Sequence, residues 1–231
     1  MSICVYAFLG KNIEDLQTRV IQGFSAIDFH LQFRPETDLL ATQPDGCLYV
    51  RLDQAPAHLN RVSPETALLL AFEYEVSMRE KNASREDGWP PKIARNCTAI
   101  VSTRTASGRS PAAYYIQALT LAIMAKESGG HFYVDVDDKP VSGKEGLDKT
   151  IRELYSEREL EFDAEAYPFE QWPPISSEDK SFIWPAPIRS VVVEQYLAAM
   201  KVPKRKFKVP LGAKITIALI TLIFVLNLLY S

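Results

Sequence analysis

The sequence is poor in the residues that build disulfide frameworks and metal sites. Its 231 residues include three cysteines and three histidines: Cys4, Cys47, Cys97, His30, His58 and His131. The cysteines are odd in number and far apart, and no C-x-x-C spacing occurs, so we expect neither a disulfide framework nor a structural zinc site. The histidines are too scattered to predict a metal centre. We therefore predict no metal and no cofactor, in a chain that resides in a reducing compartment.

Common catalytic motifs are also absent. Neither H-E-x-x-H nor G-x-S-x-G occurs in the sequence. Cys97 and His131 could form a nucleophile–base pair if folding brought them together. Cys97, however, begins a predicted strand, where cysteine usually serves as a small buried hydrophobe. We predict no catalytic residue and expect a protein that is not an enzyme.

Acidic residues are missing from the C-terminal end of the sequence. Residues 1–200 contain 20 basic and 29 acidic residues, a net charge of −9, whereas no acidic residue follows Glu194. After residue 200 the charged residues are six cations: Lys201, Lys204, Arg205, Lys206, Lys208 and Lys214. The chain therefore joins an acidic body to a basic tail.

The last residues form an apolar run that predicts a transmembrane helix. At about 1.5 Å per residue, a helix over 211–230 would be roughly 30 Å long, the thickness of the hydrocarbon core. A buried core helix is the alternative, but the run ends the chain and a basic segment precedes it. We expect a basic linker over 201–210, followed by a C-terminal anchor over 211–230.

The basic residues before this run also predict its orientation. Cations remain on the cytoplasmic side of a membrane helix, and those at the interface would be Lys204, Arg205, Lys206, Lys208 and Lys214. The N-terminal run Ser2–Leu9 is short, lacks a preceding cation and does not resemble a secretion signal. We therefore expect a single-pass protein of the inner membrane, with residues 1–200 on the cytoplasmic side.

The first 200 residues alternate between strand and helix patterns. Strands are predicted over 3–8, 47–52, 67–76, 97–103 and 131–136. Helices are predicted after the Asn12–Asp15 start pattern, from Pro111 to about Lys126, over 146–159 and over 190–200. This order predicts one globular domain of α/β or α+β class, with a mixed sheet and flanking helices.

Two polar segments could bind small ions. The loop Ser107-Gly108-Arg109-Ser110 precedes the helix that begins at Pro111, where backbone N–H groups could hold a phosphate or carboxylate. Helix capping by Ser110 explains the same residues. Asp135, Asp137 and Asp138 could ligate magnesium, but we favour a solvated turn ahead of Pro140.

All three tryptophans precede proline, at Trp89, Trp172 and Trp184. Such a tryptophan is held extended, and its large ring is a side chain favoured at binding hot spots. Acidic residues interleave with aromatic ones between 157 and 179, a pattern suited to a basic protein rather than to nucleic acid. We predict partner contacts at Trp89, Trp172, Trp184, Glu159, Glu161, Asp163 and Glu165. Loops pinned by the indole rings are the alternative for at least two of the tryptophans.

The body resembles bacterial immunity proteins. The likeness covers about residues 1–185 and is most evident in Val5-Tyr-Ala-Phe-Leu-Gly10 and in the helix–strand unit from Tyr114 to Val136. It is nearest to the immunity families paired with polymorphic toxins that resemble restriction endonucleases. The resemblance implies a protein that binds and neutralises a cognate toxin, and it assigns no individual residue a role.

Three functions follow from these patterns. The first is a membrane-anchored immunity protein that occludes a basic toxin. The second is a tail-anchored adaptor or assembly factor of a membrane complex. The third is an enzyme that binds an anionic small molecule through the loop Thr105–Ser110.

Overall fold

The computed structural model describes residues 3–78, 96–105, 110–156, 161–175, 182–191, 193–195 and 198. The chain divides into two compact units, residues 1–194 and 195–231, and every element below belongs to the first. The basic linker 201–210 and the run 211–230 lie outside the described residues. Among the residues that are described, no helix combines the length and apolarity needed to cross a bilayer. The anchor therefore stays a prediction.

Within its described residues, the first unit contains three labelled helices and eight strands. The helices are α1 (Leu16–Ser25), α2 (Pro111–Ser128) and α3 (Gly143–Ser156). The strands are β1 (Ile3–Leu9), β2 (His30–Phe33), β3 (Cys47–Gln54), β4 (Leu68–Met78), β5 (Ala99–Thr105), β6 (His131–Val134), β7 (Val141–Ser142) and β8 (Tyr167–Pro168). Each predicted strand has a counterpart, with ends that differ by up to two residues. The short strands β2, β7 and β8 were not predicted.

The strands form one sheet in the order β2-β3-β4-β5-β1-β6-β7, and β8 pairs with β4. Every described pair is antiparallel, so the prediction of a mixed sheet is wrong and the fold is α+β. The prediction assumed that strand–helix–strand order places the two strands side by side. Here β1 lies between β5 and β6 and pairs with both, so these two parallel strands never touch.

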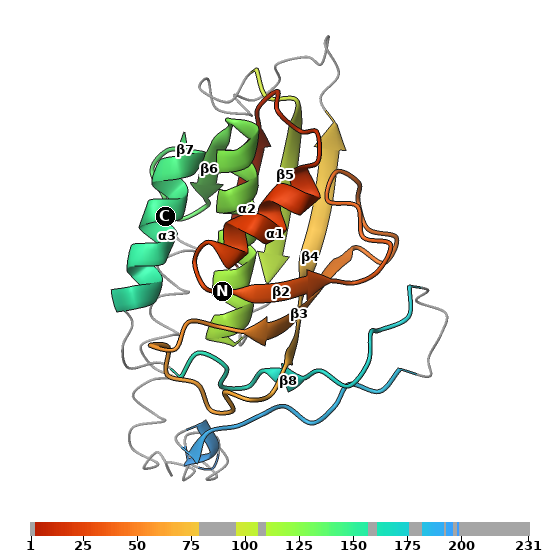
Figure 1. Cartoon of the computed structure of the whole chain (residues 1–231), viewed down its shortest axis with the longest axis vertical. Coiled ribbons are helices and arrows are strands. Elements are labelled where there is room, and N and C mark those ends of the chain that lie inside the picture. The colour runs from red at the N-terminus through yellow and green to blue at the C-terminus, as the bar shows by residue number, and fades with distance from the viewer. Residues whose placement is uncertain are drawn as a thin grey trace, which may run out of the picture. The chain divides into compact units, whose positions relative to one another are not determined.

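The helices cover one face of this sheet (Figure 1). Alternate residues point toward them, for example Val5, Ala7 and Leu9 on β1, all of which are fully buried. The central helix α2 packs on β1, β4, β5 and β6, and α1 and α3 pack against α2. Because α2 has neighbours on all sides, nearly every one of its residues is buried. The core of the domain therefore lies between α2 and the sheet.

The ends of α2 follow the sequence signals. The Ser110 hydroxyl accepts a hydrogen bond from the Ala113 N–H at 3.2 Å, and Pro111 occupies the first turn. Gly129 ends the helix at φ +71°, and the next N–H, of Gly130, donates to the Ala125 carbonyl. This left-handed glycine turn satisfies the last carbonyls of the helix. The predicted bounds of α2 are confirmed to within two residues, whereas α3 begins and ends three residues before the predicted 146–159.

α1 begins directly after the Asn12–Asp15 pattern, as predicted, but without a side-chain cap. The helix begins at Leu16, and Asp15 precedes it in the left-handed region at φ +50° without a side-chain cap. Asn12 does not cap the helix, since its amide donates to the Glu127 carbonyl at the end of α2. Leu16, Val20 and Phe24 are buried at helical spacing. The N-terminal segment of α1 is thus held by contact with the end of α2 rather than by a side-chain cap.

Candidate interaction surface

Trp184 lies in a cluster of aromatic rings from three parts of the chain. Its ring centroid is 5.0 Å from that of Tyr167 on β8 and 6.3 Å from that of Tyr49 on β3. Phe182 contacts it edge to face at 5.5 Å. Despite these contacts, Trp184 remains 41% exposed. The indole is therefore both held in place and available to a partner.

Trp172 belongs to a second group of contacts. Its ring meets Phe169 at 4.9 Å in an edge-to-face arrangement. The Arg51 guanidinium lies over the other ring of this pair, 4.7 Å from the Phe169 centroid, and its Nε is 2.6 Å from an oxygen of Asp53. Because Arg51 follows Tyr49 by two residues on β3, both side chains stand on the same face of the sheet. We call the combined surface the aromatic face; it comprises Tyr49, Arg51, Tyr167, Phe169, Trp172, Phe182 and Trp184.

Backbone pairing places these rings together. β8 pairs with Leu68 and Leu69 of β4, and the Phe169 N–H donates to the Ala67 carbonyl at 2.7 Å. The Ile188 N–H donates to the Ala166 carbonyl, which draws the segment 182–191 alongside β8. The prolines around Trp184 keep that segment extended.

Tyr49 is the most tightly held ring of the aromatic face. The Arg34 guanidinium lies 4.8 Å from its ring centroid and binds both oxygens of Asp45, at 2.8 and 3.2 Å. Burial, together with the nearby Cys47 and Asp45, raises the pKa of Tyr49 to about 12. The phenol is therefore neutral at physiological pH. Both arginines of this region are paired with aspartates, so the aromatic face itself has little net charge.

The predicted acidic contacts are only partly available to a partner. Asp163 is fully buried, and its carboxylate accepts hydrogen bonds from the N–H groups of Val62 and Ser63 at 2.5 and 3.2 Å. Arg61 Nε faces it at 3.5 Å without hydrogen-bond geometry. The prediction that Asp163 contacts a partner does not hold, because this carboxylate holds the loop 61–63 in place.

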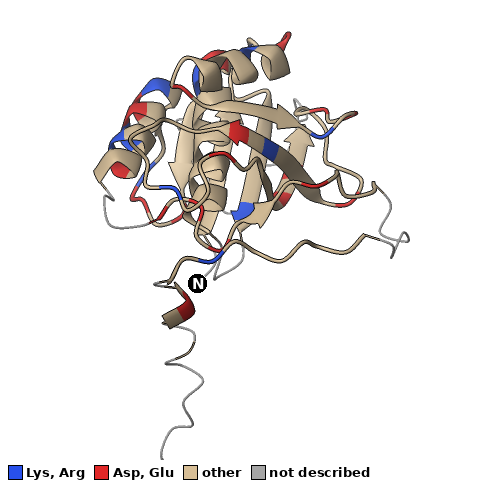
Figure 2. Cartoon of the chain, turned by 60° about the horizontal axis from the view of Figure 1, so that its bottom comes forward, with Lys and Arg blue, Asp and Glu red and all other residues tan. Residues whose placement is uncertain are grey.

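The other acidic residues predicted to contact a partner either flank Asp163 or lie outside the described residues. Glu161 and Glu165 are half-buried on either side of Asp163, and Glu165 has a left-handed backbone at φ +63°. Glu159 and Trp89 lie outside the described residues. In the view of Figure 2, acidic and basic residues are interspersed along the described elements.

The helix start at Ser110 has its donors occupied. The Ala112 N–H donates to the Phe162 carbonyl, and the Ala113 and Tyr114 N–H groups both donate to Ser110. Pro111 has no N–H. The anion site predicted there therefore lacks free donors in the first turn of α2, and capping explains Ser110. Ser107, Gly108 and Arg109 lie outside the described residues.

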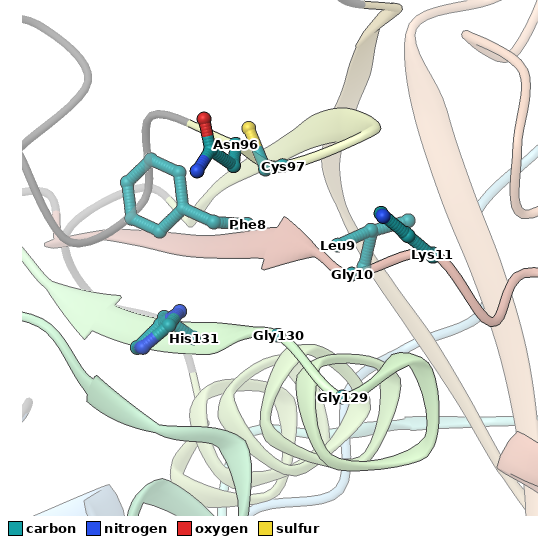
Figure 3. A pocket seen from close by; sticks show the side chains of 9 residues that line it. All are labelled: Phe8, Leu9, Gly10, Lys11, Asn96, Cys97, Gly129, Gly130 and His131. Atoms are coloured by element: carbon teal, nitrogen blue, oxygen red, sulfur yellow. The ribbon is translucent and has the colours of Figure 1, made fainter.

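Cys97 and His131 do line one pocket, of about 200 Å³, with Phe8, Leu9, Gly10, Lys11, Asn96, Gly129 and Gly130 (Figure 3). Cys97 precedes β5 and His131 begins β6, and β1 runs between these strands. Figure 3 shows β1, with the Phe8 side chain, between the side chains of Cys97 and His131. A direct nucleophile–base contact is therefore not formed.

Two of the three aspartates considered for magnesium are engaged within the chain. Asp135 accepts the Cys4 N–H at 3.0 Å, and Asp137 forms an ion pair with Lys149. No group of three or more histidine, cysteine, aspartate or glutamate side chains with metal-site geometry occurs in the described part of the chain. The membrane-interface cations Lys204, Arg205, Lys206, Lys208 and Lys214 lie outside it.

The sequence indicated Trp172 and Trp184 but not the residues that support them. Tyr49 and Arg51 alternate with the buried Leu48, Val50 and Leu52, and that alternation could have placed them on the opposite face. The comparisons with known proteins add nothing: no protein family model, no curated protein and no solved structure matches this chain.

Proposed function

We propose that this chain is a membrane-anchored immunity protein that binds a cognate bacterial toxin and neutralises it by occluding its active site. The observation that carries the proposal is the aromatic face. It offers Trp184 at 41% exposure on a base of packed rings and paired arginines. Partly exposed tryptophans on a fixed support are characteristic of binding hot spots, because little side-chain entropy remains to be lost.

Exposed aliphatic side chains on the same segments enlarge the apolar area. Ile183 is 83% exposed beside Trp184, and Ile175 is 42% exposed three residues after Trp172. An interface with such anchors and a neutral centre suits a protein partner. The −9 charge of residues 1–200 adds long-range attraction for a basic toxin, which raises the association rate. The basic linker and the run 211–230 would hold this surface at the inner membrane.

The proposal is tested with the double variant Trp172→Ala, Trp184→Ala. Wild-type protein should co-purify with the toxin encoded by a neighbouring gene and protect cells that express it. The double variant should lose about 30-fold or more in affinity, because loss of a single hot-spot tryptophan costs about 2 kcal/mol and each 1.4 kcal/mol is tenfold. Val136→Ala, which removes a 67% exposed apolar side chain from the turn after β6, is the matched control.

Two results would overturn the proposal. One is that wild-type protein neither binds the toxin nor protects the cell. The other is that the double variant binds and protects as well as Val136→Ala does. If intact membrane subunits co-purify with the wild type in place of a toxin, the chain is instead an adaptor of a membrane complex.

A further inference from the structure

Arginine side chains that lie over aromatic rings recur in the aromatic face. The Arg34 guanidinium lies 4.8 Å from the Tyr49 ring centroid, and the Arg51 guanidinium lies 4.7 Å from the Phe169 centroid. Each guanidinium is also paired with an aspartate, so neither carries an unbalanced charge. A guanidinium on a ring is thus a contact that this surface already makes twice with its own side chains.

The indole of Trp184 is a ring of the same face that no cation covers. It is 41% exposed, and in the described part of the chain no arginine or lysine lies over it. Arg189, the cation of the described segment 182–191, makes no such contact. Indole attracts a cation more strongly than the rings of tyrosine or phenylalanine do.

We propose that Trp184 receives an arginine side chain of a basic protein partner, whose guanidinium stacks on the exposed side of the indole. This inference rests on the proposed function, because it names the chemical group that the toxin presents to the aromatic face.

The neighbouring rings hold the indole without stacking parallel to it. The interplanar angles are 32° to Tyr49, 54° to Tyr167 and 82° to Phe182. A planar guanidinium can therefore lie on the exposed side of the indole while its N–H groups remain in water. Because the indole is already fixed, little side-chain entropy is lost when the cation binds.

The charges around the rings also favour a cation. Glu165 lies two residues before Tyr167, and Glu170 directly follows Phe169. Neither glutamate forms an ion pair with the described residues. Since aspartates balance both arginines of the face, these carboxylates add to the −9 charge of residues 1–200 and attract a cation to the indole. Arginine suits this place better than lysine, since its planar and weakly hydrated head group stacks on aromatic rings.

The test uses a probe that does not depend on the toxin. Full-length protein in non-ionic detergent at low ionic strength is titrated with a hexa-arginine peptide, and calorimetry gives the Kd. Mono-, di- and tetrafluorinated tryptophans, placed at position 184 by amber suppression, withdraw electrons from the ring face in steps. The affinity should fall along this series, by about threefold to fivefold for the tetrafluorinated ring. A peptide of six citrullines, which keeps the planar group without its charge, should not bind measurably.

A pair of leucine variants provides the matched control. Trp184→Leu should weaken hexa-arginine binding by about threefold to fivefold. Tyr155→Leu, at a ring on α3 that is 47% exposed, should leave the affinity unchanged.

Three results would overturn the inference. One is that hexa-arginine does not bind, and another is that its affinity stays constant or rises with fluorination, since a fluorinated ring is more apolar and would retain a purely apolar contact. The third is an equal loss in Trp184→Leu and Tyr155→Leu, which would show that the charge of the body alone binds the peptide. Each of these results leaves the toxin experiment unaffected, whereas failure to bind the toxin overturns the proposed function and does not change the peptide affinities.

Discussion

At the scale of single residues, the buried carboxylate of Asp163 has a structural role that the sequence did not reveal. It binds two backbone N–H groups and faces Arg61 inside the protein. Asp163→Ala leaves the two part-buried N–H groups without their acceptor and the buried Arg61 guanidinium without its counter-ion, so we expect a loss of about 3–5 kcal/mol in the free energy of unfolding. Urea denaturation measures it. Glu161→Ala, at a half-buried neighbour, should stay within about 0.5 kcal/mol of wild type, and equal midpoints for the two variants would contradict this role.

Tyr49 makes the stability of the folded protein depend on pH in the alkaline range. The pKa of its phenol is about 12 in the folded chain, against an ordinary value of 10.0. A raised folded-state pKa means that the associated stability is fully present below pH 10 and is lost as the pH rises toward 12. The free energy of unfolding of wild type should therefore fall more steeply across this window than that of Tyr49→Phe. Tyr155→Phe, at a 47% exposed ring, is the control, and parallel curves for wild type and Tyr49→Phe would refute the assignment.

At the scale of elements, the two ends of α2 show how far local signals decide the fold. Ser110→Ala removes the cap on the Ala113 N–H and should cost about 1 kcal/mol. Gly129→Ala should cost about 1–2 kcal/mol from the left-handed backbone alone, since nothing lies within 4 Å of the added Cβ. Thermal or urea unfolding measures both. Ser25→Ala on the exposed end of α1 should change stability by less than about 0.5 kcal/mol. If all three variants unfold at the same temperature or urea concentration, the caps do not stabilise α2.

The elements that were predicted and those that were missed differ in length and in the range of their contacts. The strands β1, β3, β4 and β5 have enough residues to show strand-like composition or alternation, and α2 has caps at both ends. By contrast, β7 and β8 have two residues each, and only their pairing with β6 and β4 defines them. Pairing between distant segments leaves no trace in a local pattern. For the same reason the sequence did not reveal that β1 separates β5 from β6.

The aromatic face was also only partly predictable from the sequence. The Trp-Pro pairs identified Trp172 and Trp184 as unusual, because proline constrains the residue before it. The side chains that surround them come from β3 and β8, more than a hundred residues apart in the case of Tyr49 and Tyr167. A charge run cannot show which of its members turns inward, and Asp163 did so because the backbone N–H groups of Val62 and Ser63 needed an acceptor.

At the scale of the whole molecule, the tail prediction has a direct test. Full-length protein should sediment with membranes during ultracentrifugation of lysed cells and should enter the supernatant only with detergent. A chain that ends at Met200 should remain in the supernatant without detergent and should bind the toxin as tightly as the full chain. Full-length protein that stays in the supernatant would refute the anchor, and loss of toxin binding on truncation would assign the tail a role in recognition.

The position of α2 has a consequence for synthesis on the ribosome. Three of the four strands that it contacts, β1, β4 and β5, precede it in the chain, as does α1. Its remaining neighbours, β6 and α3, are translated afterwards. A nascent chain that has reached Ser128 can therefore lay this helix on a nearly complete sheet, while the side that will meet α3 stays in water until Ser156 has emerged. A translational pause within that interval would expose the most apolar helix of the first unit to chaperones and proteases.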